Sequence, residues 1–255
     1  MTDSETSVSI YDKIIAFLWQ HLLLILSLFI MTFGVALCVR SNLGSSVISS
    51  IPYAMQLAGA AGKAPALTIG EYTYIMNGVL VLGQILIMRR RFHLVQLFQL
   101  VIGFLFGFLL DINMYLTSFF SFESLPIQIA AQFAGCCLLG AGVAFEIRCG
   151  SVTMPGEGMP VAITKAFGAP FVKAKICVDV SLVVIAILLG YIYFGHWLGN
   201  VIGPGTIFAM FFVGIVVRII EPHIQWFSRI VTLNPKIGKF IYGLARYLPF
   251  HRKDN

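Results

Sequence analysis

Six long apolar stretches alternate with short polar links along this chain. A hydrocarbon core of about 30 Å needs roughly 20 mostly apolar residues per spanning helix. The pattern therefore predicts an all-α integral membrane protein with six transmembrane helices. The predicted helices cover residues 14–39, 67–88, 94–117, 126–147, 174–194 and 202–220.

Two further apolar segments, 45–58 and 151–167, are too short and too rich in Gly, Ser and Pro to be ordinary spans. If each crossed the membrane, the basic cluster 89–91 and the basic C-terminal tail would lie on opposite sides. If each enters and leaves by the same face, both lie in the cytoplasm, as the positive-inside rule favours. We therefore expect re-entrant segments at 41–58 and 149–167, with both chain termini in the cytoplasm.

The two halves of the chain resemble each other. GVALCVRSNLGSSVISSIPYAMQLAG, which begins at Gly34, aligns with GVAFEIRCGSVTMPGEGMPVAITKAFG, which begins 108 residues later at Gly142. Each half would hold three spans, an odd number, so the halves must form inverted repeats about a pseudo-two-fold axis in the membrane plane. The predicted organisation is a cytoplasmic tail (1–13), a first repeat (14–120), a second repeat (121–220) and a basic interfacial tail (221–255).

Composition and charge agree with a membrane protein. Hydrophobic residues make up 58% of the chain and charged residues 11%, which excludes a soluble enzyme, a DNA-binding domain and a secreted disulfide scaffold. The net charge of +6 comes from Lys and Arg beside the apolar stretches and does not indicate nucleic-acid binding. The first apolar stretch is too long for a signal peptide, so we expect the first helix to be retained.

Several sequence features predict packing or surface contacts. The five cysteines are odd in number and lack C-x-x-C spacing, which is typical of small packing residues. Gly103-x-x-x-Gly107 and Ala131-x-x-x-Gly135 allow close helix approach. Basic and apolar residues in 234–255 predict a helix lying on the anionic inner leaflet or, alternatively, docking on a partner protein.

Four segments carry a resemblance to a known family. They are G-V-A-L-C-V-R-S-N-L-G-S-S, R-C-G-S-V-T-M-P-G-E-G-M-P, F-V-K-A-K-I-C-V-D-V-S and G-P-G-T-I-F-A-M-F-F-V-G. The chain resembles the YitT/YczE/YyaS-type bacterial multi-pass membrane proteins over most of residues 25–220. The resemblance implies a six-helix protein of the bacterial cytoplasmic (inner) membrane, and it supplies neither a substrate nor site residues.

The irregular segments 41–50 and 149–158 each precede a proline, Pro52 or Pro160, that suits the first turn of a short helix. A helix of about eight residues rises ~12 Å, so its N-terminus should lie near the membrane midplane. Irregular backbone at that depth must be buried in protein or line a wet cavity. Transporters bind substrates at broken helices of this kind.

Several polar side chains are expected at the same depth. A carboxylate within a membrane helix costs at least ~2.5 kcal/mol, so Asp179 should face a partner or water. Two carboxylates, an amide and two hydroxyls suit a cation, a proton or a zwitterion. In a structural alternative, Asp179 pairs with Lys175 and Glu157 pairs with Arg148. The predicted substrate-binding residues are Asn77, Asp179, Glu157, Ser49 and Ser50.

Asp111 and Arg218 occupy equivalent repeat positions, but inversion should place them at opposite membrane faces. We expect Arg40 to pair with Asp111 outside, and Glu146 or Glu157 to pair with Arg218 inside. Such pairs are either alternating gates or structural ion pairs. The candidate set is Arg40, Asp111, Glu146, Arg148 and Arg218.

No phosphate-binding loop, HExxH motif or nucleophile elbow occurs, and His21 and His196 are isolated. We therefore predict no enzymatic activity, no cofactor and no metal site. The leading hypothesis is a small secondary transporter or facilitator for a polar or cationic solute. A more specific version of this hypothesis adds proton coupling through Asp179. The alternative is a non-transporting accessory or regulatory membrane protein that scaffolds a partner. The expected partners are the lipid bilayer and a small solute, with a homodimer or partner protein left open.

Overall fold

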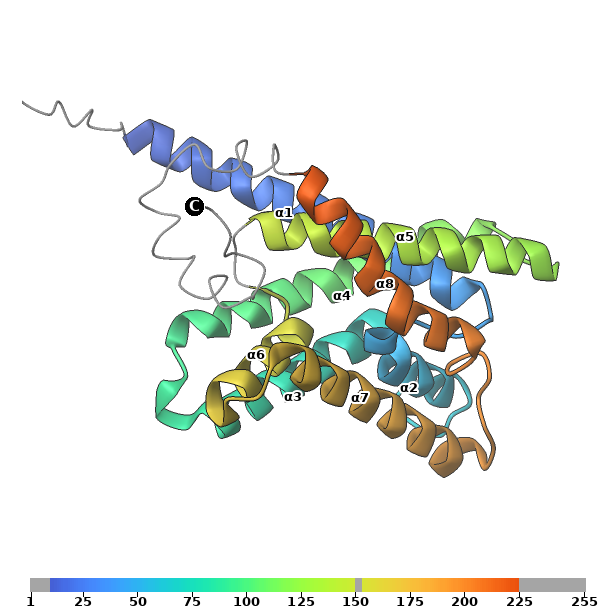
Figure 1. The fold of residues 1–255 in the computed structure, drawn as a ribbon. Helices are drawn as coiled ribbons and strands as arrows, with labels where there is room; N and C mark the ends of the chain where they lie inside the picture. Colours follow the sequence, from blue (N-terminus) through green and yellow to red (C-terminus); the bar gives the residue numbers. More distant parts are fainter. Residues whose placement is uncertain (1–9, 150–152, 225–255) are drawn as a thin grey trace, which may run out of the picture.

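A computed structural model describes residues 10–149 and 153–224, which fold into helices without any strand (Figure 1). The α-helices are α1 (Ile10–Arg40), α2 (Ser50–Ala60), α3 (Ile69–Met88), α4 (Phe98–Leu116), α5 (Leu125–Cys149), α6 (Pro155–Phe167), α7 (Phe171–Phe194) and α8 (Pro204–His223). Short 3-10 turns are η1 (Val47–Ser49), η2 (Arg89–Arg91), η3 (Leu94–Leu97) and η4 (Thr117–Phe119).

Six helices in the described ranges are long and apolar enough to cross a membrane, namely α1, α3, α4, α5, α7 and α8. Helices α2 and α6 have only 11 and 13 residues. The predicted fold class is confirmed: the chain is an all-α, multi-pass membrane protein. The interfacial helix predicted for 234–255 and residues 150–152 of the second re-entrant segment lie outside the described residues.

Local sequence explains where the short helices begin and end. Pro155 is the first residue of α6, so Pro160 lies inside the helix, and its predicted place in the first turn is wrong. Proline suits the first position because its missing N–H has no helical partner there. Gly168 ends α6 at φ 68°, a left-handed conformation that favours glycine.

Helices α1 and α5 make a close antiparallel contact along one side of the molecule (Figure 1). A Cβ added to Gly34 would lie 2.5 Å from the Leu139 backbone nitrogen, and Gly142 lies against Met31 in the same way. Gly135, from the predicted Ala131-x-x-x-Gly135 motif, contacts Cys38. Small residues therefore let the two backbones approach.

Helices α3 and α4 pack as an antiparallel hairpin. Gly107 lies against the backbone of Gly70, and Gly103 lies against the side chain of Asn77. The predicted packing role of Gly103-x-x-x-Gly107 is therefore confirmed.

The contacts of the first four helices recur among the last four. Helix α1 packs on α4 as α5 packs on α8, and α2 packs on α3 as α6 packs on α7. Helix α2 also contacts α7, as α6 contacts α3. The most extensive contact without a counterpart is that of α3 along α4, since α7 makes no comparable contact with α8.

Candidate functional site

A lysine and two carboxylates lie together where α6 meets α7. Lys175 Nζ is 3.1 Å from Glu157 Oε1 and 3.0 Å from Asp179 Oδ1. Glu157 belongs to the first turn of α6, and Lys175 and Asp179 are one turn apart on α7. Their side chains are 29%, 32% and 15% exposed, respectively. We call Glu157, Lys175 and Asp179 the charged triad.

The contacts within the charged triad test the two ion pairs expected from the sequence. Asp179 does pair with Lys175. The pairing of Glu157 with Arg148 is wrong, because the N-terminus of α6 directs Glu157 toward Lys175. Since two carboxylates share one ammonium, the group has a formal charge of −1 when every member is ionised.

Glu146 is buried beneath the same end of α6. Its side chain is only 3% exposed, and Oε1 accepts a hydrogen bond of 2.9 Å from the Met154 backbone N–H, directly before the helix. The positive end of the helix dipole favours negative charge at this position. A buried carboxylate of α5 therefore lies at the same end of α6 as Glu157.

The inner pairings expected for Arg218 are wrong. Arg218 is exposed on α8, whereas Glu146 bonds to Met154 and Glu157 pairs with Lys175. Arg148 instead forms the ion pair with α8, at 3.1 Å to Glu221 Oε1.

The outer pairing of Arg40 with Asp111 is also wrong. Arg40 Nη2 donates to the Met114 carbonyl at 2.9 Å. The Asp111 carboxylate accepts hydrogen bonds from the Thr68 hydroxyl at 2.6 Å and the Gly70 N–H at 2.8 Å. The first turn of a helix has unpaired N–H groups, so the start of α3 offers Asp111 donors at close range.

Asn77 is fully buried on α3, and neither amide atom has a hydrogen-bond partner among the described residues. It faces Gly103 on α4, not Asp179. The neighbouring Met76 nevertheless shares an apolar cluster with Val178, the residue before Asp179. Helices α3 and α7 thus meet through apolar side chains at this level.

The hydroxyl groups of Ser49 and Ser50 form hydrogen bonds within their own segment of the chain. Ser49 lies 2.7 Å, hydroxyl to hydroxyl, from Ser46, and Ser50 donates to the Val47 carbonyl at 2.7 Å. Of the five predicted binding residues, the structure therefore brings together Glu157 and Asp179, through Lys175. The binding role of all five stays a prediction.

Sequence reasoning missed a buried amide pair beside α6. Gln84 and Gln99 exchange hydrogen bonds of 3.1 and 3.2 Å, and Gln84 also donates to the Pro155 carbonyl at 3.2 Å. Gly158 lies against this pair, since a Cβ there would be 2.5 Å from Gln99 Oε1. Glutamine within an apolar stretch is the signal that could have revealed it, because buried amides need partners.

The two short helices meet at their N-terminal ends. The end of the Ile48 side chain, in η1, lies against Gly156 in the first turn of α6, and a Cβ at Gly156 would displace it. Ile48 also packs against the cluster formed by Met76, Val178 and Leu182. The junction of α2 and α6 is therefore apolar and closely packed.

Comparison with known proteins identifies a family. Residues 18–222 match the model of a family described as a family of unknown function, DUF6198. No curated protein and no solved structure matches the chain.

Proposed function

This chain belongs to the DUF6198 family, and we propose that it is a small secondary transporter or facilitator built from two inverted repeats. Its solute is a small polar or cationic molecule, bound where α6 and α7 meet. The observation that carries this proposal is the near-duplication of helix contacts between the two halves, broken chiefly at α7 and α8.

Helix directions support an inverted arrangement. Gly34 lies beside Leu139 and Met31 beside Gly142, so α1 and α5 run antiparallel. If α2 crossed the membrane as α3 and α4 do, four crossings would precede α5, and α5 would run parallel to α1. The antiparallel direction therefore favours a re-entrant α2.

The second half supports the same reasoning. Gln132 contacts Gly205, and Arg148 contacts Glu221, so α5 and α8 run parallel. If α6 also crossed the membrane, α5 and α8 would run antiparallel, so their parallel direction favours a re-entrant α6. The repeat boundaries 14–120 and 121–220 form part of this proposal, as does the relation to YitT-type proteins.

Contacts at the bundle ends agree with two re-entrant segments. Arg40 contacts Met114, and Gly70 contacts Asp111 one turn earlier on α4, so the segment between α1 and α3 starts and ends at the same end of α4. At the other end, Arg91 contacts the Lys165 carbonyl, near the C-terminus of α6.

The difference between the halves supports alternating access. In inverted-repeat transporters, the two repeats exchange conformations as the site opens to one side and then the other. Here α3 is closed on α4, while α7 is separate from α8. In the opposite state, α7 would close on α8 and α3 would separate from α4.

The charged triad supplies the chemistry of binding. The Lys175 ammonium occupies a position that suits a cationic solute, because Glu157 and Asp179 already hold a cation there at hydrogen-bonding distance. A cationic solute competes with Lys175 for the two carboxylates. A proton on either carboxylate weakens its bond to Lys175, which couples proton uptake to release of the lysine.

A second candidate function follows from the packed junction. Close apolar contact between Ile48 and Gly156 is also what a static bundle requires. In this alternative, the protein does not transport and instead scaffolds or regulates a partner in the membrane.

Flux through proteoliposomes separates the two functions. Purified protein is reconstituted with a pH-sensitive dye inside, and methylammonium, guanidinium and choline are added outside as probe cations. We expect at least one cation to drive a protein-dependent pH change that Asp179→Asn reduces at least tenfold. Glu123→Gln, which removes an exposed carboxylate in the link before α5, is the matched control and should retain flux. Equal flux in Asp179→Asn and the unaltered protein would refute the role of the triad; no flux with any cation would favour the scaffold.

A further inference from the structure

A basic groove lies at the end of α3, away from the charged triad. It is lined by the last turn of α3, by η2 and by the C-terminal turn of α6, and has a volume of about 420 Å³. The lining residues are Ile87, Met88, Arg89, Arg90, Arg91, Lys165 and Ala166.

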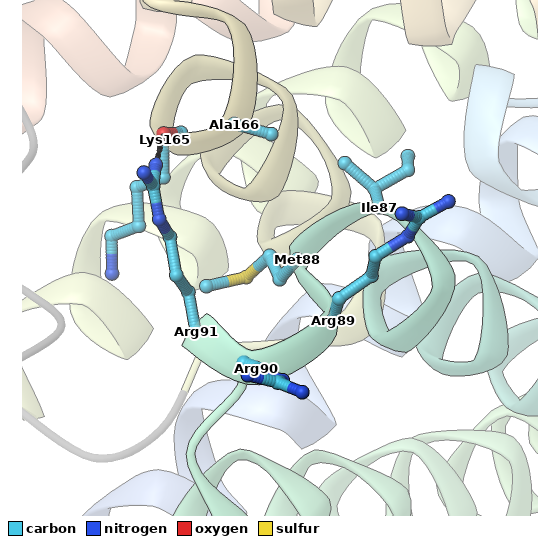
Figure 2. Close-up of a pocket in the computed structure, with 7 residues that line it drawn as sticks. All are labelled: Ile87, Met88, Arg89, Arg90, Arg91, Lys165 and Ala166. Atoms are coloured by element: carbon cyan, nitrogen blue, oxygen red, sulfur yellow. Dashed lines mark hydrogen bonds between the residues drawn. The ribbon is translucent and has the colours of Figure 1, made fainter.

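Figure 2 shows how the arginines are placed around this groove. Arg89 and Arg91 rise on either side of Met88, and Arg90 lies on the other side of the turn. Arg91 reaches the C-terminal turn of α6, where Nη1 donates to the Lys165 carbonyl at 3.4 Å. One guanidinium is therefore positioned by contact with a second helix.

The groove concentrates positive charge without an acidic side chain among its lining residues. No ion pair joins Arg89, Arg90 or Arg91 to a carboxylate in the described part of the chain. Apart from the bond that Arg91 Nη1 donates to the Lys165 carbonyl, their guanidinium donors are available to an anion. Arginine matches the geometry of phosphate oxygens by paired, parallel hydrogen bonds, which makes phosphate a better fit than a spherical anion.

The backbone at the rim is held in an unusual conformation. Arg89 has φ 47°, a left-handed value that a residue with a side chain rarely adopts. This turn lets α3 stop at Met88 and places three consecutive arginines in a single 3-10 turn. Such an outlier supports a functional reading when other features of the site point the same way.

Exposed apolar side chains lie close in the chain to the residues that line the groove. Leu86, Leu94 and Phe167 are 74%, 79% and 72% exposed. A groove with basic donors beside apolar surface suits a phosphate group at the boundary of a bilayer, since basic pockets between transmembrane helices bind anionic headgroups. The same donors suit a phosphate group carried by a soluble molecule.

We propose that the groove formed by η2 and the end of α6 binds a phosphate group, carried either by an anionic lipid or by a soluble phosphate compound. The site is separate from the charged triad and does not depend on transport. The positive-inside rule alone requires basic residues at this end of α3 but places no demand on their geometry.

The test measures thermal unfolding of the full chain in detergent by intrinsic fluorescence. One arm adds phosphatidylglycerol, with phosphatidylcholine of the same acyl chains as its control; the other adds inorganic pyrophosphate. A ligand that binds the native state raises the unfolding temperature with its concentration. A shift with phosphatidylglycerol alone assigns a lipid, and a shift with pyrophosphate assigns a soluble phosphate group as a ligand.

Two double variants locate the effect. Arg89→Gln/Arg91→Gln should require at least tenfold more ligand for half of the shift. Lys173→Gln/Arg218→Gln, which removes two exposed charges outside the groove, should stay within twofold of the unaltered protein. The proposal is overturned if neither ligand shifts unfolding, or if both variants weaken the response equally.

A third variant separates charge from geometry and remains informative if the glutamine variant does not fold. Arg89→Lys/Arg91→Lys keeps the basic charge that topology requires but loses the paired hydrogen bonds. We expect it to insert normally and to need several-fold more ligand. If this variant responds as the unaltered protein does, the arginines contribute only the positive charge that membrane topology requires. That result would contradict a phosphate site that depends on arginine geometry.

Discussion

Removing the lysine of the charged triad tests its electrostatics most sharply. Lys175→Gln leaves Glu157 and Asp179 beside each other without the ammonium that now contacts both at 3.1 and 3.0 Å. With no cation between them, the two carboxylates repel each other, and one must take up a proton or move toward water.

The expected loss follows from distance and exposure. At about 3 Å and an effective dielectric constant of about 20, each pair attracts by roughly 5 kcal/mol before desolvation. Breaking a buried pair destabilises a protein by about 3–5 kcal/mol, whereas exposed pairs contribute about 0.2–1 kcal/mol. Side chains that are 15–32% exposed lie between these limits. We therefore expect Lys175→Gln to destabilise the protein by about 2 kcal/mol.

Thermal unfolding in detergent is the assay, and about 2 kcal/mol corresponds to a fall of roughly 4–8 °C for a chain of this size. The triple variant Glu157→Gln/Lys175→Gln/Asp179→Asn has no charge left unpaired and should recover most of that loss. Recovery would show that the three residues act as one unit. A single Lys175→Gln variant as stable as the unaltered protein, or a triple variant no better than the single one, would refute this reasoning.

Further predictions concern packing and capping, each checked by thermal unfolding. Gly158→Ala places a Cβ 2.5 Å from Gln99 Oε1 and should destabilise by about 1–3 kcal/mol; unchanged stability would mean that the amide pair is not held there. Asp111→Ala removes the acceptor for the Gly70 N–H and should destabilise by about 1–2 kcal/mol, whereas no loss would show that α3 needs no cap from α4. Asn77→Leu removes a buried amide without a partner among the described residues, so stability should stay equal or rise; a fall of about 5 °C or more would show that the amide has a partner.

The fold class was predictable because membrane insertion imposes a simple rule on sequence. Each spanning helix must be long and apolar, so the pattern alone located all six candidate spans. Helix ends were less accurate. Proline suits the first position of a helix, but α6 contains two candidates, and Pro155 begins the helix instead of Pro160.

The charged residues show what sequence cannot supply. The pairing of Lys175 with Asp179 was predictable, because residues four apart on a helix are neighbours. The contact of Lys175 with Glu157 depends on how α6 lies against α7. Sequence spacing contains no information about that distance.

The same limit explains the errors at the bundle ends. Arg40 and Asp111 were matched by opposite charge at one membrane face, but hydrogen-bond donors at the start of α3 are closer to Asp111. Arg148 and Glu221 pair because α5 and α8 run parallel. Neither helix direction nor helix adjacency could be derived from charge alone.

The central claim is that α2 and α6 do not cross the membrane and the two halves are therefore inserted in opposite orientations. Single cysteines at Ala66, His93 and His196, all exposed, are introduced into a cysteine-free background and labelled in intact cells with an impermeant maleimide. Two re-entrant helices place residues 66 and 196 on one side and residue 93 on the other. We predict that cysteines at 66 and 196 are accessible from the same side of the membrane and that a cysteine at 93 is accessible only from the other side. Accessibility of 66 and 196 from opposite sides would contradict the account.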